Sequence, residues 1–313
     1  MVEDTRRMSL KSMFGGMSMS GGGDKAKTPA SSDKAKATKV RSDKTAGSTM
    51  PKAEGATPKD NTWSNSNAST FSLRRGPNYE KNKQKAPSAD ALMELVGVDC
   101  ISTSAKIDNI GAKMKIPEDW KTVNTTLAKV PGLFIVNFQI PSEFPTTIFK
   151  EITDGPGWSV VFYFKMTPET AAAMANLPKS SAGTKLFSKY CTEAPDVDSD
   201  PNSPWRGRFK ITVRCDNIDE FGLPSFITSY NAKPVLIRKN GNLIRGDGYI
   251  EMDINVHKFG SIPKQALQAL LNRFDKMYIN IGFCIESREE TEMPEVLFGC
   301  ASLNKPSINV PEW

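Results

Sequence analysis

The stretch that most constrains the fold is the run from Tyr249 to His257, in which polar and apolar residues alternate without a break. Successive side chains of a β-strand point to opposite faces of a sheet, so this run predicts a strand with one core face and one polar face. The core face holds Ile250, Met252, Ile254 and Val256, and the polar row holds Tyr249, Glu251, Asp253, Asn255 and His257. We expect the polar row to be solvated or paired with cations, as in half-exposed sheets.

Other segments carry strand patterns of the same kind. The apolar run Leu133–Ile140 predicts a buried strand, and its two amides, Asn137 and Gln139, fall on one face. Buried amides need partners, so these two either hold neighbouring backbone or face a ligand. Further strands are expected at 158–165, 208–214 and 277–285, with a tight hairpin turn at Asn240-Gly241.

Helical patterns are fewer. One helix is predicted at 168–177, capped by Thr167, and another at 262–274. Residues 91–96 fit either a short helix or a strand, and the proline- and aspartate-rich span 178–204 is expected to be a long surface loop. Many alternating strands with few helices indicate an α+β fold: one largely antiparallel sheet with helices packed on one face.

The first 60 residues differ in composition from the rest. Residues 1–60 hold 12 Lys and Arg against 7 Asp and Glu, which is +5 of the chain's formal +6, and they contain few large apolar side chains. Such a segment buries too little surface to offset its chain entropy. We therefore predict a disordered basic tail at 1–60 and a folded domain at 61–313. The domain is nearly neutral, so no nucleic-acid partner is expected.

Cysteine spacing and hydropathy limit the compartment. The five cysteines stand far apart without a C-x-x-C pair, which argues against a zinc cluster and a disulfide framework and favours a reducing compartment. No stretch reaches the roughly 20 apolar residues that cross a bilayer, and the N-terminus lacks a signal-peptide core. We expect a cytoplasmic protein, in solution or bound peripherally to a membrane.

Signatures of catalysis are missing from the sequence. There is no G-x-S-x-G, no P-loop and no G-x-G-x-x-G, and the chain has one histidine, His257. We predict no enzyme activity and no cofactor. Glu251, Asp253, Asn255 and His257 share a strand face, but hard cations usually recruit ligands from several segments, so a polar face without metal is preferred.

The third function that the sequence allows, beside catalysis and metal binding, is a binding site for an anionic or amphipathic ligand. Cationic side chains on strands beside an apolar sheet face can hold a phosphorylated head group, with an acyl part against the core. The same cations can equally be solvated surface or partners of the acidic row. The candidate ligand-binding residues are Asn137, Gln139, Lys210, Lys233, Arg245, Tyr249, Glu251 and Asp253.

Several short pieces of the chain resemble a known family, in the family's order. They are Trp63-Ser64, Phe71–Tyr79, Lys85, Val98-Asp99, Ile107–Ile110, Phe134–Pro141, Arg208–Lys210, Lys233-Pro234, Tyr249–Ile254, Phe283–Glu286 and Pro294–Gly299. In these pieces the chain is similar to the C-terminal domain family of the plant protein enhanced disease resistance 2. Lys233, Tyr249, Glu251 and Asp253 match the most recognisable positions of that family.

The resemblance implies an intracellular eukaryotic protein. In plant relatives this domain follows pleckstrin-homology and lipid-transfer START domains and is tied to membranes and to restraint of defence; this chain instead has a low-complexity segment before it. The family offers no established catalytic residues to place here. We therefore expect a non-enzymatic lipid- or membrane-associated binding module with a regulatory role. The alternatives are a protein-interaction domain without a small ligand and, third, a carboxylate- or metal-dependent enzyme.

Overall fold

A computed structural model of the chain describes residues 43–55, 59–121, 130–144, 154–197, 200, 202–205 and 207–313. Most of the predicted tail, residues 1–42 and 56–58, lies outside these residues. The part that is described does not behave as a free tail. Ala46 and Met50 are buried, and the backbone at Gly47 and Thr49 donates hydrogen bonds to Asp99. The packed region therefore begins before Asn61, the start predicted for the domain.

The strands of the described residues form two five-stranded sheets and a two-stranded ribbon. In spatial order the first sheet contains β1 (Thr62–Asn65), β12 (Leu297–Asn304), β11 (Tyr278–Ile285), β7 (Phe209–Cys215) and β8 (Pro234–Leu236). The second contains β4 (Met93–Thr103), β6 (Gly157–Met166), β5 (Leu133–Pro141), β10 (Tyr249–Asn255) and β9 (Gly241–Arg245). The ribbon pairs β2 (Ser72–Arg74) with β3 (Lys85–Pro87).

The predicted α+β class is confirmed, and pairing is antiparallel everywhere except between β5 and β10. The expectation of one common sheet is wrong, because β10 and β11 belong to different sheets. The expected hairpin at Asn240-Gly241 is wrong for the same reason: β8 and β9, on its two sides, lie in different sheets. Residues 91–96, left open between helix and strand, enter β4.

The two sheets pack on each other through a core of phenylalanines. Phe134 of β5 and Phe298 of β12 have ring centroids 4.7 Å apart, and Phe164 of β6 meets Phe283 of β11 at 5.4 Å. These side chains alternate with outward-facing ones along each strand, as strand geometry requires. Ile250, Met252 and Ile254 of β10 join the same core, which confirms the apolar face predicted for that strand.

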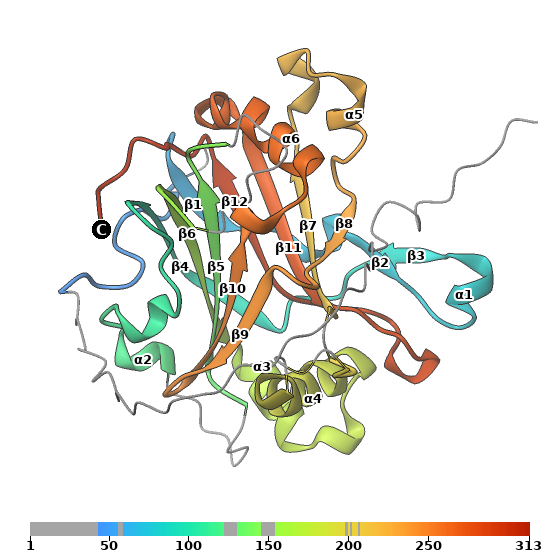
Figure 1. Cartoon of the computed structure of the whole chain (residues 1–313). Helices are drawn as coiled ribbons and strands as arrows, with labels where there is room; N and C mark the ends of the chain where they lie inside the picture. Colours follow the sequence, from blue (N-terminus) through green and yellow to red (C-terminus); the bar gives the residue numbers. More distant parts are fainter. Residues whose placement is uncertain are drawn as a thin grey trace, which may run out of the picture. The chain divides into compact units, whose positions relative to one another are not determined.

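Helices lie at the ends and sides of this layered core and at the tip of the two-stranded ribbon (Figure 1). They are α1 (Tyr79–Asn82), α2 (Glu118–Lys121), α3 (Pro168–Ala175), α4 (Ala182–Val197), α5 (Ser225–Thr228) and α6 (Ser261–Leu271). Figure 1 shows α3 and α4 at one end of the sheets and α5 and α6 at the other. The cap predicted for α3 is confirmed, since the Thr167 side chain accepts a hydrogen bond from the Thr170 N–H.

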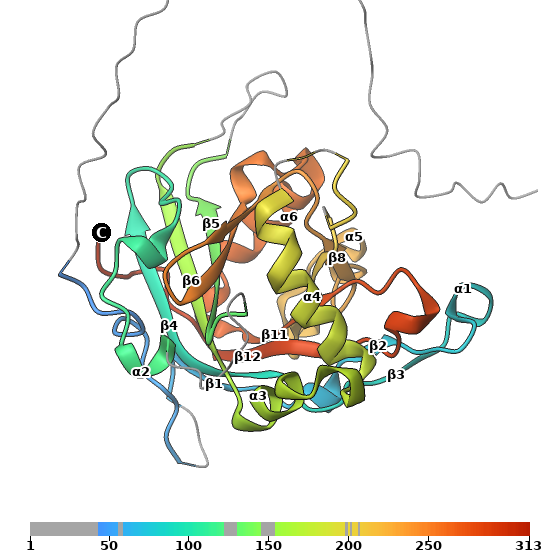
Figure 2. The same cartoon turned by 90° about the horizontal axis from the view of Figure 1, so that it is seen from below.

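The surface loop predicted at 178–204 is wrong over most of its length, because α4 occupies 182–197. Buried Leu186, Phe187, Tyr190 and Ala194 recur every three to four residues, which is a helical period masked in the sequence by prolines and aspartates. Phe187 contacts both sheets: its ring lies 6.1 Å from Phe134 and 5.2 Å from Phe298. Figure 2 shows α4 running alongside them.

The outer face of the second sheet has its own cover. A second apolar cluster joins Leu133, Ile135 and Tyr163 on the strands to Ile107 and Ile110 in the segment after β4. A sheet face covered in this way is buried on both sides, so polar side chains that point outward from β5 and β10 lie in the interior. This cover decides the environment of most of the predicted site.

Candidate functional site

The polar row of β10 is buried rather than solvated, so that part of the prediction is wrong. Glu251 is 0% and Asp253 2% exposed. Glu251 accepts hydrogen bonds from the Ile110 N–H (2.7 Å) and the Gly111 N–H (2.8 Å), one on each carboxyl oxygen. These donors belong to the first turn of a 3₁₀ helix, Ile110–Ala112, whose leading N–H groups lack partners within the turn. Glu251 supplies the acceptors.

Asp253 extends the same contact by one residue. Its Oδ2 accepts from the Asn109 N–H (2.9 Å) and its Oδ1 from Asn137 Nδ2 (2.7 Å). The Tyr249 hydroxyl donates to Asn109 Oδ1 (2.8 Å), so three side chains of the polar row hold three successive residues of one turn. We call Glu251 and Asp253 the carboxylate anchor. Every oxygen of this pair is engaged, and no cation of the described residues forms an ion pair with it.

The amides of β5 hold the same segment from the neighbouring strand. Asn137 Nδ2 donates to the Ile107 carbonyl (2.8 Å), and Gln139 Nε2 donates to Ile107 O (2.9 Å) and Asp108 Oδ1 (2.8 Å). Of the two roles left open for these amides, the hold on neighbouring backbone is therefore observed. Register explains the convergence, because Asp253 pairs with Asn137 across parallel strands.

Burial changes the acid strength of the anchor. Loss of solvation, together with the neighbouring Asp253 carboxyl, raises the pKa of Glu251 well above its ordinary value. Burial also raises the pKa of Asp253, even though Glu251, Asn109 and Asn137 act in the opposite direction. The carboxylate anchor therefore favours its protonated form more strongly in the folded chain than in the unfolded one.

At one end of this face the polar residues open into a cavity of about 360 Å³. Its lining consists of Lys106, Asp108, Gln139, Lys239, Asn240, Gly241, Asn242, Asp253, Asn255 and Lys258. We call it the lysine cavity. Lys106 pairs with Asp108. Lys239 and Lys258 are exposed, and within the described part of the chain neither forms a hydrogen bond or an ion pair.

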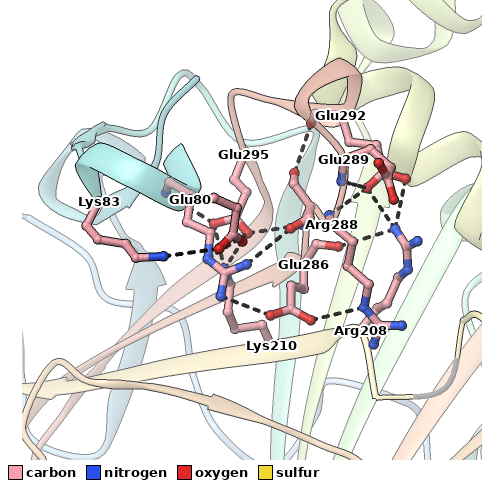
Figure 3. Close-up of polar contacts among 11 residues, drawn as sticks. Glu80, Lys83, Arg208, Lys210, Glu286, Arg288, Glu289, Glu292 and Glu295 are labelled. Atoms are coloured by element: carbon pink, nitrogen blue, oxygen red, sulfur yellow. Dashed lines mark hydrogen bonds and ion pairs between the residues drawn. The ribbon is translucent and has the colours of Figure 1, made fainter. Parts of the chain in front are cut away.

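A different group of charges lies on the first sheet (Figure 3). Lys210 of β7 is only 4% exposed, and its Nζ lies 2.5 Å from both carboxyl oxygens of Glu295. Arg74 of β2 approaches the same carboxylate at 3.9 Å and that of Glu286, the residue after β11, at 3.0 Å. Lys210 is thus the buried partner of a glutamate, and the structure does not place it with the other predicted ligand-binding residues.

Arg208 completes this group. Its Nη1 lies 2.9 Å from both oxygens of Glu292, and Arg288 reaches Glu286 at 3.3 Å. Figure 3 shows these side chains converging from β7, β11 and the turn before β12. We define the ion-pair cluster as Arg74, Arg208, Lys210, Glu286, Glu292 and Glu295. Five of the six residues, all except Glu292, lie in the sequence pieces that resemble the family. That resemblance is the signal by which the sequence could have indicated the cluster, because the alternation of polar and apolar residues does not predict these contacts.

The two remaining predicted cations lie apart from both groups. Lys233 is exposed, with its Nζ 5.7 Å from the Tyr230 ring. Arg245 Nη2 donates to the carbonyls of Cys191 (3.0 Å) and Thr192 (3.1 Å) in α4. Pro195 sits four residues after Cys191 and has no N–H to bond that carbonyl, so Arg245 supplies the missing donor.

Two further observations concern ion and membrane sites. Within the described residues, no group of three or more His, Cys, Asp or Glu side chains is placed to hold a metal ion. No helix among them is both long and apolar enough to span a bilayer.

Comparison with protein families identifies the family of this chain. The family model described as "Protein ENHANCED DISEASE RESISTANCE 2, C-terminal" matches residues 63–306, most of the chain. No solved structure matches. The matched range includes the carboxylate anchor, the lysine cavity and the ion-pair cluster.

Proposed function

Because the chain belongs to the family of the enhanced disease resistance 2 C-terminal domain, we propose that it is a non-enzymatic module that binds anionic lipid at a membrane surface and has a regulatory role. The regulatory part is carried over from the plant relatives of this family. The lipid part is supported by one observation, the lysine cavity. Lys239 and Lys258 line it and form no ion pair in the described part of the chain, so both ammonium groups are available to bind an anionic partner.

The state of the reactive groups supports a role without catalysis. All five cysteines are buried, and burial raises the pKa of the Cys100 thiol to about 12 and that of Cys300 to about 11. A thiol held neutral in this way is a poor nucleophile. The carboxylate anchor, the best acid–base candidate in the sequence, has all its oxygens engaged by the protein's own donors.

Co-sedimentation of the full chain with vesicles tests the proposal. Vesicles of phosphatidylcholine with added phosphatidylserine are expected to bind the wild type, whereas Lys239→Ala with Lys258→Ala weakens binding. Each basic residue near an anionic surface contributes about 1 kcal/mol, so we expect a loss of more than about tenfold. The matched control is Lys179→Ala with Lys185→Ala, which removes two exposed lysines outside the cavity. Equal binding by both double variants contradicts the proposal.

A second candidate function, protein interaction without a small ligand, rests on an apolar patch. Val213, Phe226, Tyr230 and Val235 are each 44–51% exposed around the free edge of the first sheet at β8. Exposed apolar groups of this kind mark interaction surfaces. If this function holds, Phe226→Asp with Val235→Lys abolishes binding to a purified partner, whereas the two cavity lysines are dispensable for it.

A further inference from the structure

We infer that the lysine cavity takes an anionic polyol, a ligand that carries hydroxyl groups beside a phosphate or carboxylate; this inference rests on the proposed function and narrows it. The lysines account for the anionic part. The polyol part comes from the acceptors that line the same cavity.

Gln139 is the decisive acceptor. It is 1% exposed, and both acceptors near its amide, Ile107 O and Asp108 Oδ1, require the NH₂ group to point toward them. The orientation of the amide is therefore fixed, and Oε1 points elsewhere. Within the described residues Oε1 has no hydrogen-bond partner. A buried acceptor without a partner costs about 1–3 kcal/mol, and a ligand hydroxyl relieves that cost.

The strand beside Gln139 adds a second group of this kind. Ser159 on β6 stands directly opposite Gln139, is 1% exposed, and its hydroxyl likewise lacks a partner among the described residues. Residues directly opposite on antiparallel strands have Cβ atoms about 4.5–5.5 Å apart, so the two unsatisfied groups are neighbours. Ser159 is not among the residues that line the lysine cavity, so Gln139 Oε1 is the member of this pair that a ligand hydroxyl in the cavity can satisfy.

The carboxyls of the cavity disfavour a bare anion relative to a polyol. Asp108 and Asp253 line it together with three lysines, so a small dianion meets repulsion as well as attraction. A polyol avoids this conflict: its hydroxyls donate to Asp108 and to Gln139 Oε1, while its anionic group lies by Lys239 and Lys258. Asn242, exposed in the same lining, has an amide that can pair with a further hydroxyl.

The test compares two small probes by calorimetry with the full chain: myo-inositol monophosphate, which has hydroxyls and a phosphate, and methyl phosphate, which lacks carbon-bound hydroxyls. The wild type is expected to bind the inositol probe at least about tenfold more tightly, or about 1.4 kcal/mol. Lys239→Ala with Lys258→Ala lowers the affinity for both probes. Lys179→Ala with Lys185→Ala changes neither.

Gln139→Met isolates the acceptor. It is expected to bring the affinity for the inositol probe down to that for methyl phosphate without changing the latter. Because the Gln139 amide also holds Ile107 and Asp108, a loss of structure would lower both affinities, and a thermal melt identifies it. Asn242 provides the second test, because its side chain is exposed and forms no hydrogen bond in the described part of the chain. If Gln139→Met loses structure, a lower affinity of Asn242→Ala for the inositol probe alone supports the inference. An unchanged preference for the inositol probe in Asn242→Ala overturns it.

Vesicle arms separate this inference from the proposed function. Binding to phosphatidylinositol vesicles above phosphatidic acid vesicles identifies a lipid head group as the source of the polyol. Binding of the inositol probe without any vesicle binding supports a free ligand and overturns the membrane proposal alone. Equal affinity for the two probes overturns the polyol inference and leaves the anionic site. Absence of binding by both probes overturns the inference, and the vesicle test with phosphatidylserine then decides the proposed function by itself.

Discussion

The molecule buries charge in two ways, one on each sheet. The ion-pair cluster surrounds its glutamates with lysine and arginine, as at Lys210 and Glu295. Among the residues that the structure describes, no cation pairs with the carboxylate anchor, which instead receives backbone N–H groups from Asn109, Ile110 and Gly111. The difference teaches that buried acids in one chain can serve either as counter-ions or as acceptors for a turn.

Removal of one charge from the ion-pair cluster should have the largest effect. Glu295→Ala removes the carboxylate that pairs with the buried Lys210 ammonium, and loss of one partner of a buried pair costs about 3–5 kcal/mol. Chemical denaturation measures the free energy of unfolding. Glu295→Ala combined with Lys210→Met removes both charges and is expected to recover part of that loss. A double variant no more stable than the single one would falsify the pairing.

Removal of a carboxyl from the carboxylate anchor should lower the free energy of unfolding by a smaller amount, because it leaves backbone donors without acceptors and leaves no buried ion unpaired. Glu251→Ala leaves the N–H groups of Ile110 and Gly111 without acceptors, at about 1–3 kcal/mol each, partly offset by the loss of a buried carboxyl. We expect a net loss of about 2–4 kcal/mol. Hydrogen exchange of those two amides should accelerate beyond the global change. The amide of Ser287, which donates to Glu295 of the ion-pair cluster, should keep its relative protection.

The two groups should respond to pH in opposite directions. The pKa of Glu251 is raised in the folded state, so its contribution is fully present below the unfolded pKa of about 4.3 and is lost as pH rises through the raised value. The pKa of Glu292 is lowered by the Arg288 N–H and Arg208 despite burial, so its contribution is present above about 4.3 and is lost as pH falls.

The comparison uses Glu251→Gln and Glu292→Gln, unfolded at a series of pH values. The stability advantage of the wild type over Glu251→Gln should shrink toward neutral pH, by about 1.4 kcal/mol for each unit of pKa difference. Its advantage over Glu292→Gln should shrink toward low pH instead. If the stability difference from the wild type changes with pH in the same direction for both variants, the proposed difference between the carboxylate anchor and the ion-pair cluster is wrong.

Arg245 extends the comparison to a cation held by backbone carbonyls. Arg245→Ala is expected to cost about 1–2 kcal/mol through the lost hydrogen bonds to Cys191 and Thr192. Pro195→Ala provides an N–H for the Cys191 carbonyl, so in the Pro195→Ala background the loss of Arg245 should cost less. Additive effects in this double-mutant cycle, measured by denaturation, contradict the role assigned to Arg245.

The sequence predicts which residues of the candidate site share a strand face. Alternation predicts Tyr249, Glu251 and Asp253 on one face, and the amides Asn137 and Gln139 are predicted either to hold backbone or to face a ligand. The environment is what the sequence does not predict: the polar row is expected to be solvated or paired with cations, and it is buried against a backbone turn. The residues that cover the polar row lie in the segment 104–121. The sequence of this segment has no strand or helix period strong enough to predict that the segment packs on the sheet.

Side-chain period is a local property, and the sequence by itself therefore determined which residues form strands, which face of β10 is apolar and that the class is α+β. Three other features depend on contacts between segments more than 80 residues apart. They are the separation of β10 and β11 into two sheets, the pairing of Lys210 with Glu295 in place of a ligand, and the burial of Glu251 against a backbone turn in place of water. Those contacts form only when the chain closes on itself, because burial and partner geometry are fixed by the packed layers and by no single stretch of residues.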